Sequence, residues 1–517
     1  MYVYNLGHRF QQTACQKADK AAIIFPEDGG DLSFSQLETF SNKVANWLCG
    51  RGLTKGQVVA IQNDKTAFGF AAMLACLKLG LIYTNFDYDN PKERLSSIFN
   101  TARPALVLAD RQITESVRAL CLENNIPYSD YSEPALRAEL EKQNEQLPTE
   151  LSANISGDNP AYIMFTSGST GIPKGVLIKH SSLLNFIDWA WQAYELADDD
   201  ILTNVNPIYF DNSVFDFYCS VFNGLTMAAF PKSVTTKPKE MLRLIDASGC
   251  TFWFSVPSFL IYLTNIKLLS ADTFKSIRAF AFGGEAYPKE LLKKLYDLYS
   301  HKARFFNVYG PTEGTCICSA HKIQPKDFDD PDSLITLGRL APNFDFLILD
   351  DDNQPSSLGE LCLLGPQLAL GYYNDQERTD KSFQPNPHNN AYNQVMYRTG
   401  DLVEEKGGQL YFRGRADNQI KHMGYRIELE EIEAGLMKLP YINQGVVVHG
   451  RTETGFSRLT AYLTVQTPCE QKVLRDDLRQ YLPEYMIPNF FEILPELPKN
   501  PNGKVDRRAL KDKAGLR

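Results

Sequence analysis

The sequence predicts an α/β protein, with a large N-terminal domain of helix-covered β-sheets over residues 1–416 and a smaller α+β domain over residues 417–517. Amphipathic helical patterns alternate with short β-branched runs through the first part, which is typical of parallel sheets covered by helices. The pattern changes after "GRAD" (residues 414–417), where a charged helix, two strands, a helix and a turn follow. A chain of 517 residues, 44% of them hydrophobic, has ample core for roughly two to four domains.

Each expected element rests on its local pattern. Residues 32–53 predict a short strand and then a helix, because Leu37, Val44, Trp47 and Leu48 fall on one stripe. Further strands are expected at 58–62, 105–110 and 161–165, and a buried helix at 69–80. In the C-terminal part we expect helices at 428–439 and 473–482 and strands at 445–450 and 459–465; the turn-rich segment 384–393 predicts a surface loop.

Composition excludes several classes of function. The net charge is −9 and no Lys/Arg-rich run occurs, so nucleic acid is not expected as a partner. The most apolar stretch, residues 70–83, is interrupted by Lys78 and is too short to span a membrane. The first residues do not follow the pattern of a secretory signal. Of ten cysteines only Cys316 and Cys318 are close together, which is a weak metal signal, so we expect reduced thiols in a cytoplasmic protein.

The segment "TSGSTGIPKGV" (residues 166–176) directly follows a predicted buried strand. A flexible surface loop is one interpretation of so many small residues. A phosphate-binding loop is the other, because the glycines are spaced, hydroxyl groups lie between them and Lys174 supplies one charge. It is not a Walker A motif, since Lys174 is followed by Gly175 rather than by Ser or Thr.

Four further stretches carry polar groups at expected turns or in apolar surroundings. Glu313, after "YGPT", either caps a helix or holds Mg²⁺ beside a phosphate. Asp401, in "YRTGDL", is either a turn aspartate or a partner of a ribose diol. Lys504 follows the strong turn signal Asn502–Gly503 and alone reads as a surface lysine. Asp211 lies in the apolar run "PIYFDNSVFDFY", where a carboxylate needs a partner from the protein or from a cationic ligand.

These motifs occur together in a specific order. The stretches "TSGSTGIPKGV", "FDNSVFD", "NVYGPTEGT", "GELCLLGPQLALGYYN", "YRTGDL", "GRADNQIKHMGYRIELEEIE" and "NPNGKVDR" resemble the core motifs of the adenylate-forming superfamily. More narrowly, they resemble the amino-acid adenylation domains of nonribosomal peptide synthesis and the D-alanine–carrier protein ligases. The resemblance covers nearly the whole chain and is weakest before residue 160.

The resemblance implies a two-step reaction that uses ATP and Mg²⁺. An amino-acid carboxylate attacks the α-phosphate of ATP and pyrophosphate leaves; the acyl group then passes to the phosphopantetheine thiol of a carrier protein. It assigns the β- and γ-phosphates to Thr166, Ser167, Gly168, Ser169, Thr170, Gly171 and Lys174. The nucleotide is assigned to Tyr309 at the adenine, Asp401 at the ribose and Arg415; the α-phosphate to Thr312, the Mg²⁺ to Glu313 and the bridging cation to Lys504.

The resemblance also implies a moving C-terminal domain and a substrate pocket. Asp417 matches the hinge, whose rotation would withdraw Lys504 and bring the segment near Gly424 to the pantetheine tunnel. Asp211 matches the partner of the α-ammonium group. The side-chain pocket is assigned to Asn212, Phe215, Phe254, Ala281, Gly283, Val308, Cys316 and Ile317, whose two phenylalanines favour a small or medium side chain.

No carrier or condensation motif is found in the chain, so we expect a free-standing, monomeric enzyme that acts on a carrier in trans. Two alternatives stay open at this point. One is an acyl- or aryl-CoA synthetase of the same fold, against which Asp211 argues. The other is a non-catalytic binding protein on this scaffold, against which the intact Lys504, Glu313 and Gly/Ser/Thr loop argue.

Overall fold

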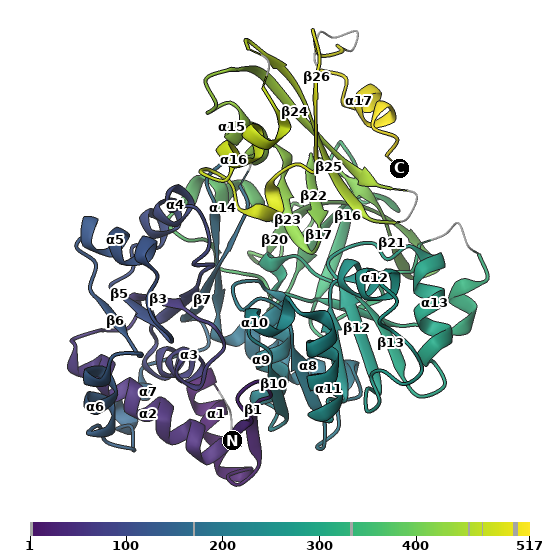
Figure 1. Ribbon diagram of the computed structural model, residues 1–517. Helices are drawn as coiled ribbons and strands as arrows, with labels where there is room; N and C mark the ends of the chain where they lie inside the picture. The colour runs from purple at the N-terminus through teal and green to yellow at the C-terminus, as the bar shows by residue number, and fades with distance from the viewer. Residues whose placement is uncertain are drawn as a thin grey trace.

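The computed structural model (Figure 1) describes residues 4–168, 171–330, 334–452, 455–467, 469–499 and 505–516. Its α/β architecture confirms the predicted fold class. Two large sheets and one smaller antiparallel sheet form the first part of the chain, and the C-terminal elements lie above them in Figure 1, drawn in yellow-green to yellow.

The first large sheet has nine strands and is parallel through its centre. Its inner strands are short, aromatic or β-branched and buried, as expected for strands covered on both faces. In spatial order the strands are β15 (Arg339–Leu340), β14 (Ser319–Lys322), β13 (Arg304–Tyr309), β12 (Ala279–Gly283), β11 (Phe252–Ser255), β9 (Ile201–Asn204), β10 (Thr226–Ala229), β1 (Ala21–Phe25) and β2 (Gly30–Ser33).

The second large sheet has seven strands, of which the five from β7 to β6 in the order below run parallel. The strands are β18 (Gly371–Tyr372), β8 (Lys174–Lys179), β7 (Pro160–Thr166), β4 (Ile82–Asn85), β3 (Val58–Gln62), β5 (Leu106–Ala109) and β6 (Tyr128–Asp130). The strands predicted at 58–62, 105–110 and 161–165 are therefore confirmed.

Helices α3 (Ala67–Leu79) and α9 (Asn212–Val221) share one hydrophobic core with strands of both large sheets. Every residue of α3 from Phe68 to Leu79 is buried, because the helix is apolar on all sides. Phe70 of α3 stacks on Phe217 of α9 with ring centroids 5.6 Å apart. This packing fixes α9, whose N-terminus carries Asp211, against both sheets.

The remaining helices of the first part lie between or beside the strands. The helix predicted within residues 32–53 is α2, and it starts with a capping box at Ser33 and Gln36. The bounds are α1 (Leu6–Gln16), α2 (Phe34–Gly50), α4 (Lys92–Ala102), α5 (Glu115–Glu123), α6 (Pro134–Glu141), α7 (Thr149–Ala153), α8 (His180–Ala193), α10 (Lys232–Thr235), α11 (Pro238–Ala247), α12 (Pro257–Asn265), α13 (Lys289–Tyr299) and α14 (Gln376–Ser382).

Residues 345–415 form an antiparallel sheet, which the expectation of parallel sheets did not anticipate. Its strands follow each other through short turns, and such connections join antiparallel neighbours. They are β16 (Asp345–Leu349), β17 (Leu358–Leu364), β20 (Val395–Lys406), β19 (Phe383–Pro385) and β21 (Gln409–Arg415). The predicted surface loop at 384–393 begins in β19 and then leaves it.

The C-terminal elements have a hydrophobic core of their own, drawn from residues 427–491. A hairpin of β22 (Gln419–His422) and β23 (Tyr425–Glu428) comes first. It is followed by α15 (Leu429–Leu436), β24 (Ile442–Arg451), β25 (Ser457–Val465), α16 (Gln471–Leu478), β26 (Phe490–Ile493) and α17 (Arg507–Lys513). These elements include the predicted helices and strands, with each helix ending earlier than its pattern suggested. The Asn502–Gly503 turn and Lys504 lie outside the described residues.

Across the described ranges, no helix has the length and apolar character needed to cross a bilayer.

Candidate active site

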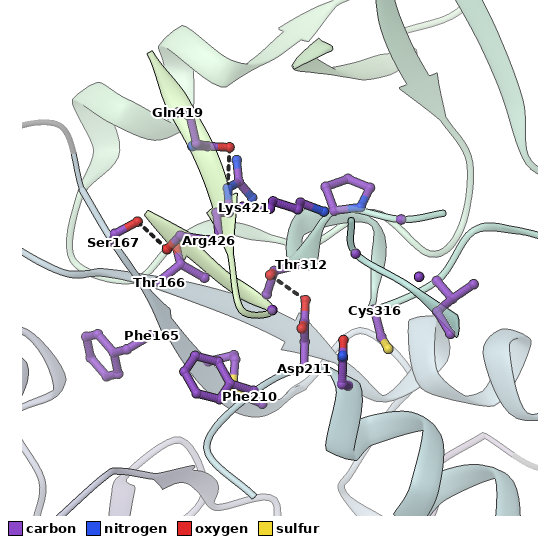
Figure 2. A pocket seen from close by; sticks show the side chains of 18 of the residues that line it. Phe165, Thr166, Ser167, Phe210, Asp211, Thr312, Cys316, Gln419, Lys421 and Arg426 are labelled. Atoms are coloured by element: carbon purple, nitrogen blue, oxygen red, sulfur yellow. Dashed lines mark hydrogen bonds between the residues drawn. The ribbon is translucent and has the colours of Figure 1, made fainter. Parts of the chain in front are cut away.

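A cavity lies where the carboxyl ends of parallel strands from both large sheets meet, the usual place for a ligand in α/β sheets. The hairpin β22–β23 closes it from above, as Figure 2 shows. Side chains from both parts of the chain line it: Arg94, Thr166, Ser167, Phe210, Asp211, Asn212, Phe254, Gly283, Val308, Thr312, Cys316, Ile317, Asp401, Arg415, Gln419, Lys421, Gly424, Arg426 and Tyr485 are among them.

The predicted phosphate loop leaves the end of β7 at this cavity. The Thr166 hydroxyl oxygen is buried and has no hydrogen-bond partner among the described residues, so it is free for a ligand. Position 168 requires glycine, because a Cβ there would lie 2.1 Å from the Ile172 carbonyl oxygen. Gly171 has a φ of +79°, and Lys174 opens β8. Ser169 and Thr170 lie outside the described residues.

Glu313 is fully buried in a short 3₁₀ helix, η1 (Thr312–Gly314). It accepts a hydrogen bond from the Tyr372 hydroxyl at 2.7 Å and pairs with Arg426 at 2.7 Å and Lys174 at 3.6 Å. Burial alone would raise the pKa of this carboxyl, but the two cations more than offset it and hold the pKa well below its usual range. Burial lowers the pKa of Lys174 to about 8. Glu313 is therefore an ionised carboxylate beside a cation, as a site for a charged ligand requires.

A second polar chain runs along one wall of the cavity. The Tyr309 hydroxyl donates to Asp401 at 2.6 Å, and Arg415 contacts the other carboxylate oxygen at 2.5 Å. Arg415 also donates to Asp417 through two nitrogens, at 2.6 and 2.8 Å. The predicted adenine, ribose and hinge residues are thus joined by one guanidinium group.

Asp211 stands at the N-terminus of α9, half-buried in the cavity wall. Thr312 donates to its carboxylate at 2.5 Å (Figure 2). Burial raises the pKa of Asp211, while the Thr312 hydrogen bond and the nearby Lys421 and Arg426 oppose that rise. No ion pair of Asp211 within 4.0 Å is found in the described part of the chain, so the carboxylate can accept a cationic ligand.

Asp216, one helical turn further along α9, belongs to a different network. It is fully buried and accepts hydrogen bonds from the side-chain amides of Asn204 and Asn206 at 3.1 and 3.0 Å. Burial raises its pKa to about 8, opposed by these bonds and by Lys65. Asp216 therefore supports the floor beneath the site.

Six of the eight predicted side-chain pocket residues line the cavity. They are Asn212, Phe254, Gly283, Val308, Cys316 and Ile317. Phe215 and Ala281 are not among the described lining residues; both are fully buried behind the wall, and Phe215 packs on Phe254 with ring centroids 4.7 Å apart. Phe215 therefore supports the position of Phe254.

Sequence reasoning did not identify Lys421, Arg426 and Arg94 as residues of this site. Lys421 and Arg426 are directly opposite each other on the hairpin, so both project to the same side, toward the cavity (Figure 2). The alternation of polar residues in "NQIKHMGYRIE" was the available signal. Arg94 lines the same cavity from α4, and no local pattern marked it.

The residues around Glu313 fit a magnesium ion that is held mainly by phosphate. Mg²⁺ is commonly bound by one or two carboxylates together with substrate phosphates rather than by an all-protein cage. In agreement, no cluster of three or more His, Cys, Asp or Glu side chains suited to a metal occurs within the described ranges. Glu313 would supply the carboxylate, and Lys174 and Thr166 would face the phosphates.

Comparison with known proteins adds independent evidence. The family model described as AMP-binding enzyme matches residues 10–373, and the AMP-binding enzyme C-terminal domain matches residues 431–504. A D-alanine–D-alanyl carrier protein ligase from Bacillus cytotoxicus is 30% identical over 98% of both chains. Surfactin synthase subunit 3 from Bacillus subtilis is also 30% identical; the match covers 98% of this chain and 38% of that protein.

Structural comparison agrees on the fold. An o-succinylbenzoate CoA synthetase from Bacillus subtilis superposes with a TM-score of 0.83 at 22% identity, covering 99% of this chain and 98% of that one. The chain spans only 9–38% of the length of three multidomain synthetases that it matches.

Proposed function

The chain belongs to the AMP-binding enzyme family and is an adenylate-forming ligase; on that premise we propose that its substrate is an amino acid. It condenses the amino acid with ATP to an aminoacyl-adenylate, and it transfers the aminoacyl group to the phosphopantetheine thiol of a carrier protein. The carrier-ligase relative, matched over the full length of both chains, supports the second step.

The Asp211 carboxylate carries the choice of substrate. It stands in the cavity wall with a hydroxyl donor, Thr312, and without a close cation. A buried carboxylate is costly unless it is paired. The α-ammonium group of an amino acid supplies that charge and orients the carboxylate of the substrate toward the nucleotide. An acyl or aryl acid has no such group, which disfavours the CoA-synthetase alternative.

In the first step a substrate carboxylate oxygen attacks the α-phosphorus, and the bond to the β-phosphate oxygen breaks. The chain must position two anions and balance their charge. Tyr309, Asp401 and Arg415 hold the nucleoside, while Thr166, Ser167, Gly168 and Lys174 hold the leaving phosphates. Mg²⁺ held by Glu313 neutralises phosphate charge when bound. Lys504, outside the described residues, bridges the reacting groups.

In the second step the thiol sulfur attacks the acyl carbon, the bond to the adenylate oxygen breaks and AMP leaves. The described arrangement suits this step, because the hairpin that carries Lys421 and Gly424 closes the cavity. Gly424 has a φ of +85°, and a Cβ there would lie 2.7 Å from Val256, so a side chain is excluded at the tip. We infer that residues 417–517 turn about Asp417 between the two steps.

The side-chain pocket favours a small or medium amino acid. Phe254 and Ile317 fill its wall, and Phe215 behind Phe254 keeps that ring from retreating.

A choice between acceptors tests the proposal. The enzyme is given ATP, an activated amino acid and either coenzyme A or a separately supplied phosphopantetheinylated carrier, and thioester is measured by mass spectrometry. We expect loading of the carrier and little aminoacyl-CoA. Preferential formation of acyl-CoA from a deaminated acid would establish the alternative instead.

A further inference from the structure

A buried anion site joins the two parts of the chain at the phosphate loop. Arg94 of α4 pairs with one carboxylate oxygen of Glu431 of α15, and both side chains are buried, with 8% and 2% exposure. The other carboxylate oxygen accepts the Gly168 backbone N–H at 3.3 Å. A guanidinium group and a loop N–H thus converge on one carboxylate, which is the donor set that phosphate oxygens prefer.

Docking of the C-terminal residues occupies further donors of the same loop. Ser167 donates its hydroxyl to the Arg426 carbonyl at 2.7 Å and accepts the Glu428 N–H at 3.2 Å. Arg426 meanwhile holds Glu313. The groups assigned to the leaving phosphates are therefore engaged by the hairpin and α15 in this arrangement, and they become free when those elements move away.

Arg94 needs an anion in either arrangement. It stays with α4 when Glu431 leaves with α15, and a buried guanidinium without a partner is strongly unfavourable. Burial lowers the pKa of Arg94, yet Glu431 raises it above the ordinary value, so the group is charged in the docked state. Because Arg94 lines the cavity beside Thr166 and Ser167, an anion bound at the loop lies within its reach.

We propose that Arg94 and the Gly168 N–H form a pyrophosphate-binding site, and that Glu431 takes the place of a phosphate there when the C-terminal residues dock. Pyrophosphate and docking then compete for one site, so the second half-reaction cannot begin before pyrophosphate has left. The inference rests on the proposed function in one respect, that pyrophosphate is the leaving group.

Calorimetric titration with magnesium pyrophosphate, without amino acid, tests the competition. Arg94→Gln removes a charged ligand and should weaken binding roughly 10- to 100-fold. Glu431→Gln removes the competitor and should tighten binding several-fold, because a larger fraction of the protein has a free site. Glu433→Gln is the matched control, since Glu433 lies on the same helix but pairs with Arg507 inside the C-terminal part; its affinity should equal that of the unmodified protein.

Opposite signs for the first two variants are the result that supports the site. Equal affinities, weaker binding in both, or a loss in the control as large as in Arg94→Gln would overturn it. Arg94→Lys, which keeps the charge and loses the fork, should be intermediate and serves if Arg94→Gln does not fold.

Amide hydrogen exchange on the unmodified protein gives a second readout. The Gly424 N–H donates to Glu285 at 2.6 Å and the Glu428 N–H donates to Ser167, so both report docking. Magnesium pyrophosphate should speed their exchange, and unchanged protection at saturating pyrophosphate would contradict the competition. Neither experiment needs an amino acid, so failure to activate amino acids would refute the proposed function while leaving this result standing.

Discussion

Substitution of Asp211 by Ala tests the assignment of the α-ammonium site. At an effective dielectric constant of about 20, two unit charges about 4 Å apart attract by roughly 4 kcal/mol. Loss of one partner of a buried charged pair commonly costs about 3–5 kcal/mol. Part of this is recovered, because burial already raises the pKa of Asp211 and the substitution removes that unfavourable charge. A net loss of about 2–4 kcal/mol corresponds to roughly 30- to 1,000-fold weaker amino-acid binding.

The assay is amino-acid-dependent ATP–pyrophosphate exchange, with KM measured separately for the amino acid and for ATP. We expect the KM for the amino acid to rise by that factor and the KM for ATP to change less than about threefold. Asp211→Asn controls for volume and should behave like Asp211→Ala. Thr312 donates to Asp211, so Thr312→Ser, which keeps the hydroxyl, should have a much smaller effect.

The pH dependence of the unmodified enzyme supplies an independent check. The raised pKa of Asp211 means that its carboxyl is protonated in part of the population at pH values where an ordinary aspartate is ionised. Because only the carboxylate attracts the ammonium group, kcat/KM for the amino acid should rise with pH through that raised pKa and then level off. Asp211→Asn should abolish this rise. An equal KM increase for ATP and the amino acid, or a substrate affinity unaffected by Asp211→Ala, would refute the reasoning.

Three further predictions concern the C-terminal residues. Lys504→Ala should lower the adenylation rate by on the order of 10²–10³ with nucleotide binding retained; pyrophosphate exchange at a normal rate would remove Lys504 from the mechanism. Asp417→Pro should slow carrier loading far more than pyrophosphate exchange, because proline fixes φ at the proposed hinge, and equal losses would indicate misfolding instead. Burial lowers the pKa of His422 to about 4 and of His449 to about 3, and both rings contact the Ser457 hydroxyl at 2.6 Å. Both histidines are neutral when folded, so the unfolded chain binds more protons below about pH 6.5 and stability should fall as pH drops from there toward about 4; a melting temperature that stays constant over this window would contradict the shifts.

The sequence predicted the fold class and most of the cavity wall, since these follow from local patterns. Motif order was enough to bring together Tyr309, Asp401 and Arg415, which are far apart in sequence and joined by hydrogen bonds in the structure. The antiparallel sheet of residues 345–415 was missed because a short apolar run such as "LCLL" does not reveal the direction of its neighbours.

The residues that sequence reasoning missed depend on how the C-terminal part docks. Arg94 and Glu431 are separated by 337 positions in the chain, and neither lies in a local pattern that indicates a site. Their pairing follows from the position of α15 over the phosphate loop. Phe215 shows the same limit in the opposite direction, because one helical turn separates a wall residue from its support.

The most direct test of the account is ATP–pyrophosphate exchange with matched pairs of substrates. Each small or medium amino acid, in its D and L forms, is compared with the acid that differs only in lacking the α-amino group. The account predicts exchange with at least one amino acid and at most background exchange with its deaminated partner, because Asp211 then has no cation to bind. Equal exchange with both members of a pair would contradict the central claim and favour an acyl-CoA synthetase.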